Sequence, residues 1–260
     1  MLIDSHCHLN YPGLAEDVPG VLGRAREAGI GGFLGISTRR NEWEAVIAQA
    51  DAEPDIWATV GIHPHEADLH PDTDTATLID ATTHARVIGI GETGLDYFYD
   101  KSDRDRQKAS FAAHIAAARV TGLPLIVHTR DAEADTLTLL QAPGEGVLRG
   151  VIHCFTASQA FADAALALGF YISISGIVTF KNARDLQTTA ATLPADRLLV
   201  ETDAPFLSPV PMRGKPCEPA FVAHTARFLA GIRGENFDDL ASTTTRNFFD
   251  LFGKAQNPCG

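Results

Sequence analysis

The chain has 260 residues, of which 45% are apolar and 21% charged, a composition that excludes a disordered or fibrous protein and fits one large α/β domain or two small ones. Its 33 acidic and 21 basic side chains give a formal net charge of −12, which argues against a broad basic surface for nucleic acid. A phosphate-bearing substrate would have to be held locally by a few cations.

No segment approaches the roughly 18 consecutive apolar residues that a membrane span needs, and the amino terminus lacks the features of a signal peptide. We therefore expect a cytoplasmic protein with no membrane partner, and nothing in the sequence indicates an obligate protein partner. The four cysteines, Cys7, Cys154, Cys217 and Cys259, contain no C-x-x-C pair, so we expect free thiols rather than a zinc ribbon or a dithiol redox motif.

Short apolar runs rich in β-branched residues recur along the chain with turns and helical segments between them. They cover residues 2–4, 32–36, 57–62, 86–90, 123–127, 150–152, 170–174 and 198–200. Most are continuously apolar, which is typical of parallel strands covered on both faces. Their spacing leaves room for one helix and two loops between successive strands.

The segments between these runs carry helix signals. Ser102 with Asp105 resembles a capping box, and Gly122 is placed to end that helix. Ser158 is expected to begin another helix, and Pro219 suits a first helical turn after the eighth strand. A last helix is expected over residues 237–252.

Eight strand-helix units predict an α/β fold of the (β/α)8 TIM-barrel type, forming one domain over residues 1–260. The alternative is an open, doubly wound sheet, which would normally place a glycine-rich phosphate turn after its first strand. Here histidines follow the first strand, and the GIGETG stretch at residues 89–94 is only a loose match to such a turn. The barrel is therefore the preferred prediction.

The first polar feature along the chain is the His-x-His pair of His6 and His8. Alternate residues of a strand project to the same face, so both rings can point at one spot while Cys7 points away. This geometry suits a metal chelate, although a polar strand end is the commoner meaning of such a pair alone.

The remaining strand ends support the chelate interpretation. Active sites of such barrels lie at the carboxyl ends of the strands, where the following loops meet. Nitrogen or carboxylate side chains stand at five of these ends: His6, His8, Glu92, His128, His153 and Asp203. A single histidine or carboxylate would more often be a hydrogen-bonded or ion-paired core residue, but few basic residues lie at these ends, and buried carboxylates need compensating cations.

Six ligands are too many for one open catalytic zinc ion and suit two divalent ions. Such a pair needs a bridging carboxylate, for which Glu92 is the candidate because it is central in strand order. Two ions roughly 3.5–4 Å apart can polarise a phosphoryl or carbonyl oxygen and activate a water, so hydrolysis is the expected reaction. Mixed histidine and carboxylate ligation tolerates Zn, Mn, Ni and, less comfortably, Mg.

Nearly the whole chain resembles the TatD-type metal-dependent deoxyribonucleases of the amidohydrolase superfamily. The resemblance is carried by DSHCHL, VGIHPH, GETGLDY, HTRDA, HCF, ETDAPFL and RGKPCEPAF, of which GETGLDY and ETDAPFL are specific signatures. It implies that His6, His8, Glu92 and Asp203 hold one ion and that Glu92, His128 and His153 hold the second. It also implies that Asp203 orients or deprotonates the attacking water.

Further residues are candidates for supporting the site. Glu201 shares the strand parity of Asp203 and would either steady the site or form an ion pair inside the barrel. The resemblance places His63 beside the substrate rather than beneath a metal. Arg213 and Lys215, in the loop after the eighth strand, are candidates for a phosphate clamp. Tyr97 and Phe98 would either stack on a terminal base or only pack.

Two departures from the family pattern bear on substrate choice. The common HCFSG becomes HCFTA, with Thr156 and Ala157, and the usual tyrosine and asparagine around the RGK loop become Met212 and Cys217. Neither departure touches a proposed ligand.

The sequence favours a two-metal phosphodiesterase that trims a single-stranded or frayed DNA end, with a 3′ to 5′ direction implied by the resemblance. The first alternative is an ester or amide hydrolase, such as an aminoacyl-tRNA deacylase, on the same metal site. The second is a non-catalytic binding barrel whose metals are structural.

Overall fold

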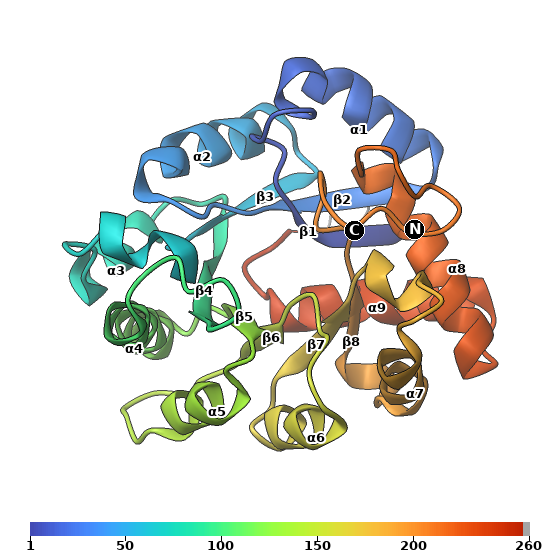
Figure 1. Ribbon diagram of the computed structural model, residues 1–260. Helices are drawn as coiled ribbons and strands as arrows, with labels where there is room; N and C mark the ends of the chain where they lie inside the picture. Colours follow the sequence, from blue (N-terminus) through green and yellow to red (C-terminus); the bar gives the residue numbers. More distant parts are fainter. Residues whose placement is uncertain (257–260) are drawn as a thin grey trace.

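The computed structural model describes residues 1–256, in which eight parallel strands form one nearly closed barrel in the order β1 to β8. Helices surround the strands, and Figure 1 shows this ring in a view along the barrel. The fold is a single-domain (β/α)8 TIM barrel, as predicted. The strands are β1 (Leu2–Cys7), β2 (Ile30–Gly35), β3 (Ile56–Val60), β4 (Val87–Asp96), β5 (Leu125–Arg130), β6 (Gly150–Ile152), β7 (Tyr171–Ile174) and β8 (Leu198–Val200).

Helices α1 to α7 alternate with the strands, and α8 and α9 both follow β8. They are α1 (Val18–Glu27), α2 (Trp43–Ala52), α3 (Thr75–Ala81), α4 (Arg104–Thr121), α5 (Glu133–Gln141), α6 (Gln159–Ala167), α7 (Arg184–Thr192), α8 (Val222–Arg233) and α9 (Phe237–Leu251). Short 3-10 turns complete the chain: η1 (Ala15–Asp17), η2 (Arg40–Glu42), η3 (Pro64–Leu69), η4 (Gly176–Thr179), η5 (Ala195–Arg197) and η6 (Pro219–Phe221). Pro219 thus begins a 3-10 turn that leads into α8 rather than the helix itself.

The apolar core has two layers. The outer layer fills the space between the strands and the ring of helices. The inner layer fills the barrel itself, where Ile3, Trp57 and Ile126 pack with Phe248 and Phe252 from α9 and the residue that follows it. The far end of the barrel is thus filled with apolar side chains, which leaves chemistry to the end where the carboxyl ends of the strands meet.

Three strands extend beyond their apolar runs. Gly94 pairs with His128 and Asp96 pairs with Arg130, so β4 and β5 stay hydrogen-bonded after their sequences turn polar. Gly94 has φ +139°, and a Cβ there would collide with the backbone carbonyl of His128. Glycine therefore permits the close approach of the two strands. β1 also continues past its apolar run, so His6, Glu92 and His128 all lie within strands rather than after them.

The helix-start predictions are partly confirmed. The Ser158 hydroxyl accepts a hydrogen bond from the Phe161 N–H and caps α6. The capping box at Ser102 is wrong, because Asp103 caps α4 by accepting from the N–H groups of Asp105 and Arg106. The Ser102 hydroxyl instead donates to the His65 carbonyl, which ties the loop after β3 to the start of α4.

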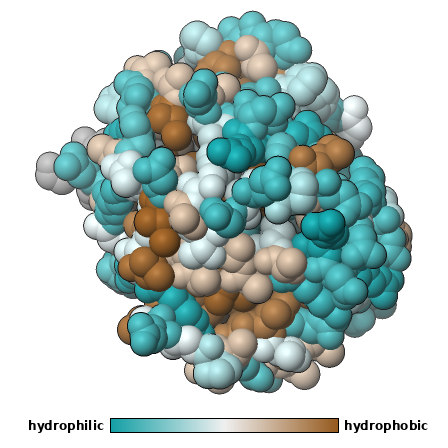
Figure 2. Space-filling view, turned by 90° about the vertical axis from the view of Figure 1, so that its left-hand side faces the viewer, coloured by the Kyte–Doolittle hydropathy of each residue, from teal (hydrophilic) through white to brown (hydrophobic). Residues whose placement is uncertain are grey.

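Within the described residues, no helix has both the length and the apolar character that crossing a membrane requires. The cytoplasmic location stays a prediction. Cys7, Cys154 and Cys217 are free thiols, as expected, whereas Cys259 lies outside the described residues. The face over α2, α3 and α4 is mainly hydrophilic with separate apolar patches, as Figure 2 shows.

Candidate metal centre

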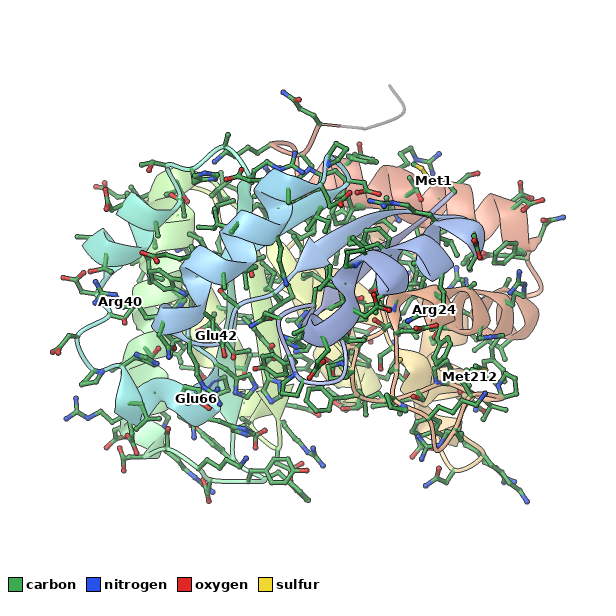
Figure 3. All side chains as sticks on the ribbon, turned by 90° about the horizontal axis from the view of Figure 1, so that it is seen from above. Met1, Arg24, Arg40, Glu42, Glu66 and Met212 are labelled. Atoms are coloured by element: carbon green, nitrogen blue, oxygen red, sulfur yellow. The ribbon has the colours of Figure 1, made fainter. Side chains whose placement is uncertain are left out.

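The loops at the carboxyl ends of the strands gather at one end of the barrel. Glu66, after β3, and Met212, after β8, lie toward this end in Figure 3, and Met1 lies at the opposite end. The backbone N–H of Asp203 donates to the carbonyl of His6 and that of His8 donates to the carbonyl of Ala204. These bonds join the first strand to the segment after the last and complete the mouth of the barrel.

The histidines of β1 lie beside Asp203. Their ring centroids are 5.1 Å apart, and Cys7 lies in the outer core, so the alternation along the strand holds as predicted. Asp203 Oδ1 lies 3.3 Å from His8 Nε2 and 3.7 Å from His6 Nε2. One ligand atom from each of these three residues lies within 4.8 Å of the other two, so they form a group that could hold one ion.

The carboxylate of Glu92 lies between this group and a second set of histidines. Its Oε2 is 3.3 Å from His6 Nε2 and 3.9 Å from His8 Nε2. Its Oε1 is 3.2 Å from His128 Nδ1 and 2.7 Å from His153 Nε2. Each oxygen of Glu92 therefore faces a different set of nitrogen donors, and all six residues singled out in the sequence lie together.

Two nitrogen donors of the cluster that face Glu92 lack hydrogen-bond partners within the described residues. Among residues 1–256, Nε2 of both His6 and His153 is buried without a hydrogen-bond partner, although Glu92 oxygens lie 3.3 Å and 2.7 Å away. Atoms that share one ion, each at about 2.0–2.2 Å, lie roughly 3–3.4 Å apart without pointing at each other. Because a buried unpaired nitrogen is costly, bound divalent ions would satisfy these atoms.

The carboxylates are held in their charged form. Burial by itself raises the pKa of Glu92, but the charge of His153 and the close approach of His128 and His153 outweigh burial and hold that pKa well below its usual value. Burial also raises the pKa of Asp203. The close approach of His8 and the charge of His6 outweigh burial, so this pKa lies below its usual value. Burial lowers the pKa of His63 to about 4, which favours its neutral form. The cluster thus presents carboxylates ready to bind cations.

Asp203 lies within the cluster, whereas Glu201 lies behind the His153 ring. Asp203 has φ 57°, a left-handed conformation that is uncommon outside glycine and often marks a functional site. Glu201 is fully buried and accepts a hydrogen bond from the Cys154 N–H at 2.8 Å. Its Oε1 lies 3.4 Å from His153 Nδ1. No lysine or arginine within residues 1–256 forms an ion pair with Glu201, so its neighbour is a histidine of the cluster.

Sequence reasoning missed Asp96 and His65. Asp96 is buried at the end of β4, and its Oδ2 lies 3.0 Å from both His128 Nε2 and His65 Nε2. Its Oδ1 accepts from the backbone N–H groups of Phe98 and Tyr99. Asp96 therefore fixes the orientation of the His128 ring, whose Nδ1 faces Glu92. The available signal was its spacing, since it follows Glu92 by four residues within the same strand.

The residues predicted to contact substrate differ in position. His63 Nε2 lies 3.4 Å from Glu92 Oε1, so His63 belongs to the cluster. Arg213 is exposed and stacks on Phe180 at 3.9 Å, and neither it nor Lys215 contacts the cluster within the described residues. The phosphate-clamp role of Arg213 and Lys215 stays a prediction.

Tyr97 and Phe98, which directly follow β4, have different surroundings in the structure. The Tyr97 hydroxyl donates to Asp135, and Arg104 covers the Tyr97 ring at 4.2 Å, so Tyr97 has a packing role. Phe98 is 54% exposed. Of the family departures, Cys217 is buried and Met212 packs against the outer core, whereas Thr156 is exposed and Ala157 half-buried.

A cluster of histidines and carboxylates at the carboxyl mouth of a (β/α)8 barrel defines the metal-dependent hydrolases of the amidohydrolase superfamily. The family model described as TatD related DNase matches residues 3–253. The chain therefore belongs to the TatD family of metal-dependent hydrolases.

Relatives in sequence and structure agree with this assignment. The chain is 41% identical to the uncharacterized metal-dependent hydrolase YcfH of Escherichia coli K12, over 96% of this chain and 95% of the relative. It is 35% identical to the 3'-5' ssDNA/RNA exonuclease TatD of Erwinia tasmaniensis, over 96% and 99% of the two chains. The crystal structure of YjjV, a TatD homologue from Escherichia coli K12, matches with a TM-score of 0.91 and 30% identity, covering 97% and 98% of the chains.

Proposed function

We propose that this hydrolase is a two-metal phosphodiesterase that removes nucleotides from a single-stranded or frayed DNA end in the 3′ to 5′ direction. The observation that carries the proposal is the position of Glu92, with one oxygen toward His6 and His8 and the other toward His128 and His153. The relative named as a 3'-5' exonuclease supports the substrate class and direction.

In this proposal, His6, His8, Glu92 and Asp203 would hold one divalent ion, and Glu92, His128 and His153 would hold the second. The ions, of Zn, Mn, Mg or Ni type, would polarise the phosphoryl oxygen and lower the pKa of the attacking water when bound.

The protein's own groups then position the reactants and move the proton. Asp203 is ionised at neutral pH because its pKa lies below its usual value, so it can accept the proton of the attacking water. His63 is 13% exposed at the edge of the cluster and would contact the phosphate or its leaving oxygen. Glu201, beside His153 Nδ1, holds that ring in place from behind.

The substrate form follows from charge and shape. A formal charge of −12 repels a long duplex, whose binding depends on many phosphate contacts. The cluster side chains are largely buried, which supports a flexible strand end rather than a stiff duplex as the substrate. An end-trimming activity fits these two constraints.

The test is hydrolysis by metal-loaded protein of an end-labelled single-stranded oligonucleotide and, in parallel, of aminoacyl-tRNA. We expect mononucleotides to be released stepwise from the 3′ end, and this release should stop when EDTA is added. Release of the amino acid with an intact oligonucleotide would favour the deacylase alternative. No turnover of either substrate with Mg, Mn, Zn or Co would favour a structural metal site.

Replacement of Asp96 tests how the His128 ring is held. We expect Asp96→Ala to weaken binding of the ion that Glu92, His128 and His153 would hold by about 10- to 100-fold, because His128 loses the carboxylate that orients it. Titration of metal-free protein with Mn²⁺, followed by activity at saturating metal, measures the effect. Asp68→Asn, a neighbouring carboxylate on η3 without a contact to the cluster, is the control. Unchanged affinity in Asp96→Ala would contradict the positioning role.

A further inference from the structure

A patch of aromatic and basic side chains lies at the ends of β4 and β5. We call Phe98, Tyr99, Lys101 and Arg130 the aromatic-basic patch. Phe98 and Tyr99 are 54% and 52% exposed, so both rings are accessible to a ligand. The Arg130 guanidinium carbon lies 3.9 Å from the Phe98 ring centroid and 4.8 Å from that of Tyr99. Lys101 Nζ lies 5.6 Å from the Tyr99 ring.

The aromatic-basic patch adjoins the candidate metal centre. The Tyr99 ring packs on its edge against His65 at 5.4 Å, and His65 lies 4.4 Å from His63, both measured between ring centroids. Arg130 follows His128 by two residues in β5, so it projects to the same side of the strand, roughly 6–7 Å further out of the barrel. A chain that leaves the cluster on this side therefore reaches Arg130 first.

The charges of the patch are available to a ligand. Within residues 1–256, no carboxylate forms an ion pair with Arg130 or Lys101, whereas nearby Arg104 is bound by Asp100 through two hydrogen bonds. Stacking fixes the plane of the Arg130 guanidinium and leaves its N–H edges free to donate. In a protein with a net charge of −12, two unpaired cations beside two exposed rings indicate an anionic ligand with a flat group.

Building on the proposed function, we propose that the aromatic-basic patch binds the part of a single-stranded nucleic acid next to the cleaved end. One base stacks on Phe98 or Tyr99, Arg130 donates to the adjoining phosphate, and Lys101 adds positive charge. Stacking on exposed aromatic rings together with cationic contacts to the backbone is the usual way of binding single strands without sequence preference. The patch would thereby direct the terminal phosphodiester toward Glu92.

Binding of a fluorescein-labelled oligothymidylate, followed by anisotropy, tests the patch. Metal-loaded Asp203→Asn protein is used, at pH 6, so that little of the strand is hydrolysed during the measurement. We expect Phe98→Ala to raise the Kd by about 5-fold or more. Phe98→Trp, which keeps an aromatic ring, should bind the strand as the wild-type residue does. We expect Arg130→Ala to weaken binding and to reduce the slope of log affinity against log salt by about 0.7, the value for one lost phosphate contact on a single strand.

Arg197→Ala is the matched control, because Arg197 also lies over an aromatic ring, Tyr171, but at the opposite end of the barrel. It should leave the Kd and its salt dependence unchanged. Wild-type affinity in both Phe98→Ala and Arg130→Ala would overturn the patch as a binding site. Strand binding that the variants weaken, with no strand hydrolysis by the wild-type enzyme, would support the patch and contradict the proposed function alone.

Discussion

Replacement of Glu92 by glutamine is expected to lower kcat/KM for oligonucleotide hydrolysis by more than about 1,000-fold, a larger loss than the 10- to 100-fold typical of residues that only support a metal ligand. The physical reason is the double contact of this carboxylate. Its two oxygens face different donor sets, at 3.3 Å from His6 and 2.7 Å from His153. The amide of glutamine supplies one oxygen only, and its N–H₂ group would point positive hydrogens at the second ion.

The measurement combines kinetics with metal content. Glu92→Gln protein should retain its circular dichroism spectrum and bind fewer than two ions per chain. Glu66→Gln is the matched control, since Glu66 is a carboxylate at the same end of the barrel that pairs with Arg39 rather than with the cluster. Full activity in Glu92→Gln would contradict the two-metal account.

Replacement of Asp203 by asparagine is expected to lower kcat by about 100- to 10,000-fold, the range that a general base contributes. The asparagine oxygen can still face His6 and His8, so metal content should fall less than in Glu92→Gln. The side chain, however, no longer accepts a proton.

The pH dependence distinguishes loss of the base from loss of a ligand. In the wild-type enzyme the pKa of Asp203 lies below its usual value, so the base is already ionised at neutral pH and the rate gains nothing from its titration there. In Asp203→Asn, hydroxide must replace the base, so the rate should rise steadily between about pH 6 and pH 9. A variant that loses activity equally at every pH would show that Asp203 acts only as a ligand.

Much of the fold could be predicted because each strand carries its own signal. The eight apolar runs match the eight strands, since parallel strands buried on both faces need continuous apolar sequence. The gathering of His6, Glu92 and Asp203 then follows from topology, because the carboxyl ends of all strands in such a barrel meet at one mouth.

The features that could not be predicted from the sequence depend on side-chain contacts between distant elements. Asp96 lies beside His128 only because Gly94 allows β4 and β5 to stay paired beyond their apolar runs. The stacking of Arg130 on Phe98 depends on the loop after β4, for which no periodic pattern exists. The cap at Asp103 rather than Ser102 likewise reflects a tertiary bond, from the Ser102 hydroxyl to the His65 carbonyl.

A crystal structure of Mn²⁺-loaded protein with anomalous scattering data tests most directly whether two ions share Glu92. We expect two anomalous peaks about 3.5–4 Å apart, one on each side of the Glu92 carboxylate. His6, His8 and Asp203 would surround one peak, and His128 and His153 the other. A single peak elsewhere, or the six side chains paired with one another and no peak between them, would contradict a two-ion site at Glu92.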